Sequence, residues 1–470
     1  MWPRMGVAVG HDAGDVIVVG AGLSGLTAAV DLADAGLQVT VVEARDRVGG
    51  RLKTVPLPGT DHDTLDVGGQ WVGPGQNRIT ALLDGLALDR FRTYEDGAHL
   101  VDFAGRLRRY RGRIPRISPV VLLDAKRAQS ALERAGRRLP ADEPWRGRAA
   151  EAADAQTFAS WLARHTVTPG ARRFFRVVTG AVFAAEPEEL SALWVQLYVR
   201  AAGGLDLLID TGGGAQQDRI VGGTQQIAQR LADRLGGRVV LRAPVTEVEW
   251  TDRDVQVRAG GRLLRAARAI IALPPLLAGR LAYQPGLPTQ RAQLTQRMPM
   301  GAVIKVMAVY DTPFWRDAGL SGQAASDRLP VSVAFDTSPP SASPGVLLGF
   351  LEGRHATDAA TLSAADRREL VIGCFTRYFG NRAAQPEHYV EQDWTAERYS
   401  GGCYGAFTTP GTLSRFGSAL RRPVGSLHWA GTETASRWTG YMDGAIEAGQ
   451  RAATEVLTAL RGTPAAPRPD

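Results

Sequence analysis

The sequence predicts an α/β fold in which separated parts of the chain build one domain, and three segments support this prediction. Residues 15–44 read "DVIVVGAGLSGLTAAVDLADAGLQVTVVEA", which is typical of a strand, a glycine turn, a helix and a second strand. Residues 219–250 and 425–460 return to an alternation of strand, turn or loop, and helix. Because short apolar strands separated by helices are typical of a parallel sheet, we expect these three segments to belong together.

Each element of the first segment has its own signal. The run from Val16 to Val19 is continuous and apolar, as in a strand that a parallel sheet buries on both faces. Apolar residues then recur at helical spacing from Leu23 to Ala33, and Gly36 is suited to the end of that helix. The valines of residues 39–42 begin the second strand.

The remainder of the chain predicts a second domain inserted into the first. Residues 89–220 are rich in arginine and alanine and read as helices, whereas residues 295–396 read as strands, loops and a helix. We therefore expect a first domain made of residues 15–88, 221–294 and 397–461 and a second domain made of residues 89–220 and 295–396.

Composition excludes several classes of protein. The net charge of +7 comes from arginines spread along the chain, and the densest run, "RLRRYRGRIPR" at 106–116, is better explained as a solvated face than as a nucleic-acid site. Two cysteines, Cys374 and Cys403, argue against a disulfide framework, and the scattered histidines indicate no metal site.

The chain also lacks the signals of a membrane protein. No charge-free apolar run approaches the ~20 residues that span a bilayer, so we expect a soluble, cytoplasmic protein without a membrane anchor. Residues 1–14 and 462–470 are expected to be flexible termini.

A lysine stands in the middle of the apolar strand "GAVIKVMAVY", residues 301–310. The chain has 55 lysines and arginines, of which only Lys53, Lys126 and Lys305 are lysines. Burying an ammonium group among apolar side chains is costly unless the group is paired or its pKa changes. Lys305 is therefore a candidate functional residue; the alternative is a lysine that extends to an acid at the sheet edge.

A glycine pattern follows the first strand. Gly20, Gly22 and Gly25 form G-x-G-x-x-G at the start of the helix, and Glu43 ends the second strand eighteen residues beyond Gly25. This arrangement lets a diphosphate approach the backbone at a helix N-terminus and places a carboxylate near a ribose. Gly49 and Gly50, between two arginines, extend the predicted dinucleotide site.

Five motifs in collinear order carry a resemblance to a known family. They are "RVGGR", "DVGGQWVGPGQNRI", "VIKVMAVYDTPFW", "YSGGCYGAF" and "WAGTETASRWTGYMDGAIEAGQRAA". From about residue 15 to about residue 460 the chain resembles the flavin-containing monoamine oxidases. The resemblance implies that the dinucleotide is FAD. It also implies a Rossmann-like, discontinuous FAD-binding domain with an inserted α+β substrate domain built on a mixed sheet.

The resemblance assigns roles to the catalytic residues. Lys305 matches the lysine that holds a water against the flavin N5. Tyr404 and Tyr441 match two tyrosines that face each other across the amine. Cys403 matches the cysteine that is bonded to the flavin 8α carbon in members spelled "GGCY", although some relatives hold FAD without this link. Cys374 is expected in the core.

The same resemblance implies two sets of binding residues. Those expected to contact FAD are Gly20, Gly22, Gly25, Glu43, Arg45, Gly50, Arg51, Gly69, Gln70, Trp71, Val245, Trp394, Cys403, Gly431, Thr432, Glu433 and Met442. Those expected to contact substrate are Ile209, Gln216, Phe350, Tyr404 and Tyr441. Asp206 and Asp210 depart from the family's pattern; they are expected to be surface charges, whereas an acid in the cavity would favour a diamine or polyamine.

The sequence therefore predicts a FAD-dependent amine oxidase that converts a primary or secondary amine to an imine and aldehyde and reduces O2 to H2O2. Its partners would be a small amine and O2, with no nucleic acid, and a homodimer is one assembly that we consider. An L-amino-acid oxidase or a biosynthetic flavin oxidase of the same fold is the alternative. A C–C desaturase or a non-catalytic flavin-binding protein would leave the two tyrosines unexplained.

Overall fold

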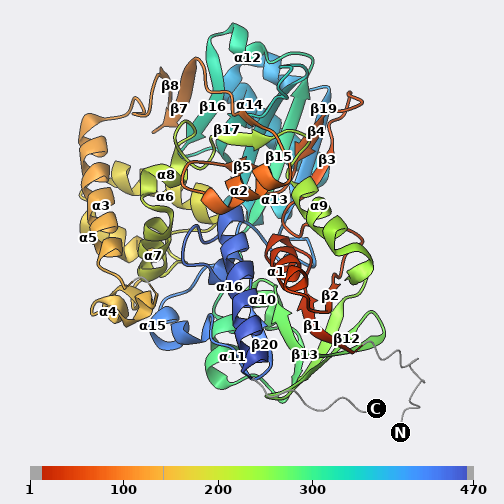
Figure 1. The fold of residues 1–470 in the computed structure, drawn as a ribbon. Helices are drawn as coiled ribbons and strands as arrows, with labels where there is room; N and C mark the ends of the chain where they lie inside the picture. The colour runs from red at the N-terminus through yellow and green to blue at the C-terminus, as the bar shows by residue number, and fades with distance from the viewer. Residues whose placement is uncertain (1–12, 141, 463–470) are drawn as a thin grey trace, which may run out of the picture. The chain divides into compact units, whose positions relative to one another are not determined.

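The computed structural model describes residues 13–140 and 142–462 (Figure 1). The chain divides into two compact units. The described part of the first unit consists of residues 13–50, 225–296 and 416–462, and the second unit consists of residues 51–224 and 297–415.

The two units are defined by contacts within the structure, whereas the two predicted domains are defined by their expected ligands, FAD and substrate. Both interrupt the chain near residues 221 and 295, and they differ in where they place residues 51–88 and 397–415. The assignment of one domain to FAD and the other to substrate stays a prediction. Apart from residues 13, 14 and 462, the segments predicted as flexible termini lie outside the described residues.

The first unit is built on an eight-stranded sheet with a parallel centre. Its strand order is β10-β2-β1-β13-β12-β11-β14, and β20 also pairs with β13. The parallel strands at its centre are β10 (Val239–Val240), β2 (Val39–Val42), β1 (Ala13–Val19), β13 (Arg262–Ile271) and β20 (Leu427–Trp429). The strands that extend it beyond β13 are β12 (Val255–Ala259), β11 (Val245–Trp250) and β14 (Ala282–Gln284). The three segments that the sequence predicts to belong together do share this sheet.

Helices of the first unit cover this sheet (Figure 1). They are α1 (Leu23–Asp34), α9 (Gln225–Leu235), α10 (Pro275–Ala278), α11 (Thr289–Gln296) and α16 (Met442–Arg461). Helix α1 packs against both α9 and α16. The contact with α16 is close because Gly449 has no side chain: a Cβ there would lie 2.4 Å from the backbone oxygen of Ser24.

The second unit is built on a seven-stranded mixed sheet, as predicted. Only the β16–β7 pair is parallel among its described pairs. In spatial order the strands are β19 (His388–Asp393), β15 (Val303–Tyr310), β18 (Gly345–Glu352), β17 (Val331–Asp336), β16 (Leu320–Ser326), β7 (Ala98–Phe103) and β8 (Arg106–Tyr110).

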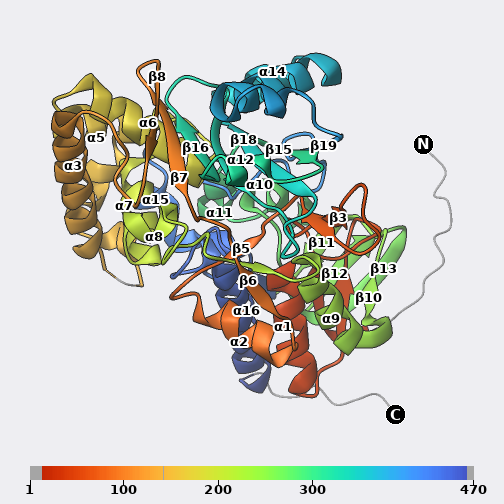
Figure 2. The ribbon, with the colours of Figure 1, turned by 90° about the horizontal axis from the view of Figure 1, so that it is seen from above.

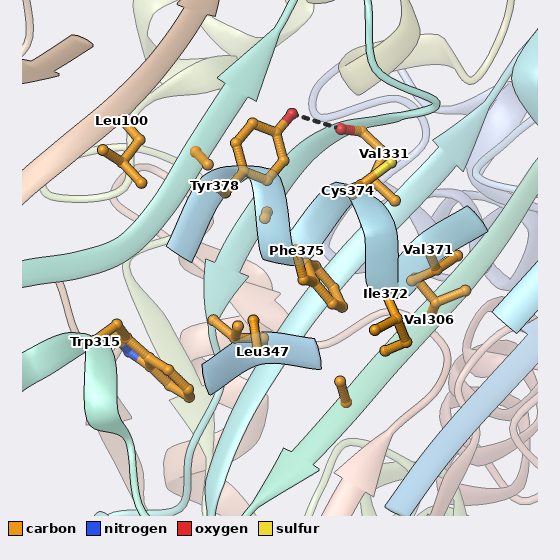
Figure 3. Packing of buried hydrophobic residues seen from close by; sticks show 14 of the residues in the cluster. Leu100, Val306, Trp315, Val331, Leu347, Val371, Ile372, Cys374, Phe375 and Tyr378 are labelled. Carbon is orange, nitrogen blue, oxygen red and sulfur yellow. Dashed lines mark hydrogen bonds between the residues drawn. The ribbon is translucent and has the colours of Figure 1, made fainter. Parts of the chain in front are cut away.

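Two opposite faces of β15 are buried, which explains its continuous apolar sequence. Ile304 and Val306 belong to a core on one face, and α14 (Ala364–Phe379) covers this core with Phe375 and Tyr378 (Figure 3). The hydroxyl of Tyr378 donates to the backbone oxygen of Val331 at 2.7 Å. Cys374 lies in the same core, as expected.

The other face of β15 carries Lys305. Val303 and Met307 share this face, as the alternation predicts, and belong to a second core cluster that includes Phe350, Trp394 and Cys403. Lys305 itself is 4% exposed. The sequence pattern thus predicted both the strand and the burial of its lysine.

Strands at residues 90–110 differ from the prediction of helices for residues 89–220. Strand β8 is the edge of the mixed sheet, and two of its three arginines, Arg106 and Arg109, are exposed. Charged side chains on an edge strand oppose pairing with another chain. Protection of a sheet edge accounts for the arginines of β8 within this run.

Helices and two small sheets complete the second unit, and Figure 2 shows the helices of residues 119–209 grouped beside β7 and β8. The helices of this unit are α2 (Asn77–Gly85), α3 (Pro119–Arg137), α4 (Ala150–Asp154), α5 (Phe158–His165), α6 (Pro169–Phe183), α7 (Ala192–Ala202), α8 (Leu205–Ile209), α12 (Phe314–Asp317), α13 (Arg354–Ala360), α14 and most of α15 (Leu413–Phe416). The small sheets pair β3 (Thr54–Pro56) with β4 (Thr64–Asp66), and β9 (Asp218–Ile220) with β5 (Trp71–Val72) and β6 (Arg90–Arg92). Among the described residues, no helix is both long and apolar enough to cross a membrane.

Candidate active site

The glycine turn of the first unit leaves no room for a side chain at two of its three glycines. Gly20 has a φ of +103°, and a Cβ there would lie 2.9 Å from the backbone oxygen of Ala272. A Cβ on Gly25 would lie 2.0 Å from the backbone oxygen of Gly20. Nothing lies within 4 Å of the Cβ position of Gly22, the residue that precedes α1. Space is therefore kept open at the middle glycine of the motif.

Glu43, which follows β2 directly, stabilises this turn through hydrogen bonds. Its Oε2 accepts from the backbone N–H of Ala21 at 2.9 Å, and its Oε1 accepts from the backbone N–H of Arg45 at 3.0 Å. The Arg45 guanidinium lies 3.5 Å from Oε1. The second glycine turn is adjacent, since a Cβ on Gly50 would lie 3.3 Å from the Cα of Gly22.

A C-terminal loop meets the same turn. The backbone N–H of Gly431 donates to Ser24 Oγ, in the first turn of α1, at 2.9 Å. Thr432 Oγ1 donates to the backbone oxygen of Tyr441 at 2.8 Å, immediately before α16 begins at Met442. Tyr441 packs edge-on against Trp438, with 5.2 Å between ring centroids, and burial raises the pKa of its phenol.

These residues of the first unit fit the diphosphate and ribose of a dinucleotide. No side chain among the described residues caps the N-terminus of α1, so its first backbone N–H groups can bind an anion. The Cβ-free cradle beside them admits a group close to the backbone. Gly20, Gly22, Gly25, Glu43, Arg45, Gly50, Gly431 and Thr432 are brought together here; Glu433 follows in the same loop, whereas Val245 begins β11.

In the second unit, Lys305 is held by three oxygen atoms. Its Nζ donates to the backbone oxygen of Asp66 at 2.5 Å, to the backbone oxygen of Gly68 at 2.8 Å and to Gln70 Oε1 at 2.5 Å. An ammonium group has three donors and no acceptor, so these contacts match its charged form. The alternative of a lysine extended to an acid at the sheet edge is wrong.

Burial opposes that charge and lowers the pKa of Lys305 to about 7. The charge of Asp66 raises this pKa, the charge of Arg219 lowers it, and Cys403 raises it again. Burial also raises the pKa of the Asp66 carboxyl, against hydrogen bonds from Thr54 and Thr224. Lys305 is thus a group whose protonation can change near neutral pH.

Aromatic rings surround this amine. Lys305 Nζ lies 5.9 Å from the ring centroid of Trp71 and 5.7 Å from that of Phe350. Trp71 packs against Phe335 at 5.0 Å, and Phe350 packs edge-on against Tyr404 at 5.8 Å. The predicted residues Trp71, Phe350 and Tyr404 therefore form one aromatic wall beside Lys305.

Two buried donors in this region have no partner among the described residues. They are Gln70 Nε2 and Trp71 Nε1. Both lie within the segment that holds Lys305, and an unpaired buried donor is unfavourable unless a ligand or water satisfies it. Hydrogen-bond acceptors such as those of a flavin ring fit these two donors.

Glycines hold Cys403 against the start of β15. The backbone N–H of Cys403 donates to the backbone oxygen of Gly301 at 3.0 Å, and Gly402 has a φ of +140°. A Cβ on Gly402 would lie 2.4 Å from the same oxygen of Gly301. Cys403 is buried, and its Sγ lies 3.7 Å from the backbone oxygen of Tyr404.

Other predicted cofactor residues support the loops of this site. Arg51 Nη1 donates to the backbone oxygen of Tyr404 at 2.8 Å. Trp394 Nε1 donates to the backbone oxygen of Val67 at 2.9 Å, and Thr224 Oγ1 donates to that of Gly69 at 2.6 Å.

The sequence did not identify Glu352, a polar residue that contacts the aromatic wall. Its Oε1 accepts from the Tyr404 hydroxyl at 2.8 Å, and its Oε2 accepts from Ser332 Oγ at 2.6 Å. Burial raises its pKa to about 7, against both hydrogen bonds. The available signal was its position two residues after Phe350 in "LLGFLEG", which places both side chains on one face of a buried strand.

The predicted substrate residues of the helical region lie around α8. Ile209 ends this helix and is partly buried. Gln216 Nε2 donates to the backbone oxygen of Leu208 at 3.0 Å, and its buried Oε1 has no partner among the described residues. Gln216 can therefore still accept a hydrogen bond.

The two acids of this region pair with basic residues. Asp206 has a side chain that is 56% exposed and lies 3.6 Å from Lys126 Nζ. Asp210 lies 3.3 Å from Arg113 Nε. Asp206 is thus a surface charge, as expected, and Asp210 is a partly buried member of an ion pair.

Comparison with known proteins identifies the family. Residues 23–457 match the family model described as flavin containing amine oxidoreductase. Flavin-containing amine oxidase A of Canis lupus familiaris is 38% identical over 451 residues, covering 95% of this chain and 85% of the relative.

Two solved structures of amine oxidases are also similar to this chain. Wild-type putrescine oxidase bound to putrescine has a TM-score of 0.92 and 35% identity to this chain, covering 95% of this chain and 100% of that one. Cyclohexylamine oxidase from Brevibacterium oxydans IH-35A has a TM-score of 0.91 and 34% identity, covering 95% and 99%. The predicted family, fold class and type of reaction are confirmed. The chain belongs to the flavin containing amine oxidoreductase family and is a FAD-dependent amine oxidase.

Proposed function

We propose that this enzyme oxidises the C–N bond of a primary or secondary amine that carries an apolar group. The amine loses two electrons and two protons and becomes an imine, which water hydrolyses to an aldehyde or ketone, and O2 takes up the electrons and protons as H2O2. Bound FAD would supply the two-electron acceptor. The observation that carries this proposal is the buried amine of Lys305 beside the aromatic wall in a chain of this family.

Tyr404 and Phe350 would bind the amine. Aromatic faces attract a cationic nitrogen and exclude water from it, and a fixed wall orients the α-carbon. Tyr404 is fixed at both ends, since Arg51 holds its backbone oxygen and Glu352 holds its hydroxyl. Tyr441 belongs to the first unit, and its role as the second aromatic face remains a prediction from the resemblance.

Lys305 would hold a water and supply positive charge for oxygen reduction. Two of its three acceptors are backbone oxygens, whereas the third is the side chain of Gln70. Gln70 is therefore the acceptor that a water would replace with the least rearrangement. A fixed ammonium favours the negative charge that develops as O2 is reduced.

Cys403 is proposed to bind FAD covalently through a thioether. Its backbone is held by glycines that allow close approach to a ring. If the thioether forms, acid-denatured protein should remain yellow, and Cys403→Ala should release its flavin into the supernatant. Complete release of flavin from the wild type would exclude the thioether but not the oxidase.

The substrate is best tested with a panel of amines scored by release of H2O2. The aromatic wall and the pairing of Asp206 and Asp210 with basic residues support a monoamine. Benzylamine and cyclohexylamine should then be oxidised faster than putrescine or L-phenylalanine. Preference for putrescine would favour a diamine oxidase, and preference for L-phenylalanine would favour an L-amino-acid oxidase.

Two further predictions concern the protein's location and its oligomeric state. We expect a cytoplasmic protein, which cell fractionation tests. A homodimer is the assembly considered, and the mass of the holoenzyme in light scattering tests it.

A further inference from the structure

A buried carboxyl adjoins the aromatic wall at the hydroxyl of Tyr404. Glu352 is the last residue of β18 and is 3% exposed. It pairs across the sheet with Val303 and, because side chains alternate along a strand, it shares a face with Phe350. Lys305 stands opposite Phe350 in the same register.

Among the residues that the structure describes, only neutral donors bond to this carboxyl. The Tyr404 hydroxyl donates to Oε1 and the Ser332 hydroxyl donates to Oε2. No ion pair joins Glu352 to any residue in the described parts of the chain. A buried carboxylate without a cation is unfavourable for stability. We therefore infer that Glu352 has a role other than stabilising the fold.

We propose that Glu352 is a positioning residue that acts through Tyr404. By accepting the phenol hydrogen, the carboxylate fixes the orientation of the Tyr404 ring and increases the electron density of the face presented to an amine. A charge-assisted hydrogen bond is stronger than a neutral one, and a more electron-rich ring attracts a cation more strongly. This inference rests on the proposed function of Tyr404 as an amine-binding residue.

The pKa of Glu352 supports this role. At about 7, it places the change between carboxylate and carboxylic acid in the neutral range, with burial as the main cause. Charged and titratable groups on the elements packed around it are Lys305 on β15, Arg176 on α6, which pairs with Glu186 and Glu188, and Arg354 and His355 at the start of α13. Ser332 on β17 is a neutral donor. Below about pH 7 the protonated carboxyl should hold the phenol less strongly.

A double-mutant cycle on the holoenzyme tests the proposal. We expect Glu352→Gln to lower kcat/KM for a cationic amine by about tenfold, the value of one hydrogen bond to a charged group. In the Tyr404→Phe background the same change should have almost no further effect. Glu352→Gln should also remove an ionisation near neutral pH from the kcat/KM profile. Ser332→Ala, which leaves the Tyr404 contact in place, should cost less than about threefold.

A second variant separates the positioning role from a merely structural one. If Glu352 positions Tyr404, Glu352→Met should preserve or raise resistance to urea, since it removes a buried charge, while still lowering kcat/KM. Parallel losses of stability and kcat/KM, or additive effects of Glu352→Gln and Tyr404→Phe, would overturn the proposal. If the wild type binds FAD but oxidises no amine, the proposed function fails; the same cycle in urea unfolding then still shows whether residues 352 and 404 are coupled.

Discussion

Lys305 combines a buried position with a full set of hydrogen bonds. Two backbone oxygens and one amide oxygen accept its protons, and burial lowers its pKa to about 7. We expect Lys305→Met to lower O2-dependent turnover about 100-fold, as the loss of a fixed charge at a developing anion does. Bleaching of the flavin by amine without O2 should change only a few-fold. Rapid-mixing absorbance of the two half-reactions measures this difference.

Lys126 provides a matched control for that substitution. It is an exposed lysine on α3, paired with Asp206, and Lys126→Met should leave both half-reactions unchanged. Equal losses in the two half-reactions of Lys305→Met would contradict a role in oxygen reduction and indicate a general loss of the site.

The same lysine predicts a pH dependence of stability. Its pKa is about 7 in the folded protein and ordinarily 10.5, so between these values the unfolded chain binds a proton that the folded chain does not. The free energy of unfolding of the wild type should therefore rise with pH, relative to Lys305→Met, by about 1.4 kcal/mol per pH unit. This gain should disappear as the pH falls to 7 and below. Urea unfolding of both proteins over this range measures it, and parallel curves would contradict it.

At the level of elements, the turn between β1 and α1 contains one glycine that packing requires, Gly25, and one that only ligand binding would require, Gly22. Gly25→Ala places a Cβ 2.0 Å from a backbone oxygen, and we expect it to destabilise the protein by about 1–3 kcal/mol and to lower its flavin content. Gly22→Ala meets nothing within 4 Å, and Gly22 has a φ of −74° that alanine adopts readily. It should lower flavin content while changing the free energy of unfolding by less than about 1 kcal/mol.

Melting curves of flavin-free protein and the flavin absorbance per chain make this comparison. The two substitutions lie three residues apart in the same motif and differ in what the added Cβ meets. Retained flavin in Gly22→Ala would show that no group approaches the backbone at this glycine, against the proposed dinucleotide site.

Elements with a strong local signal were predicted from the sequence. The pattern of β1, α1 and β2, and the two buried faces of β15, follow from apolar spacing alone. The strand at 106–110 was missed because arginines occupy three of the five residues of β8. An edge strand buries too little of its surface for spacing to reveal it.

At the scale of the whole molecule, contacts distant in sequence decide what local patterns cannot. Residues 51–72 follow the glycine motif directly, yet β5 pairs with β9 at residues 218–220, and the Asp66 carboxyl accepts from Thr54 and Thr224. Glu352 was missed for a similar reason. Its link to Tyr404 joins residues 52 positions apart, and no spacing rule places a loop tyrosine over the end of a strand.

The site residues were predicted unequally. Rarity and an apolar setting identified Lys305 from the sequence itself, whereas Tyr404, Cys403 and Tyr441 came from the resemblance. Neither the sequence pattern nor the resemblance predicted the hydrogen-bond acceptors of Lys305, because two of them are backbone oxygens. Backbone groups carry no sequence signal of their own.

The central claim, oxidation of an amine by the FAD-containing enzyme, is tested most directly by titrating the purified holoenzyme with benzylamine in the absence of O2. The flavin absorbance should bleach in proportion to the amine added, and O2 should restore it with stoichiometric release of H2O2. Protein with a full complement of FAD that no amine bleaches would contradict the claim.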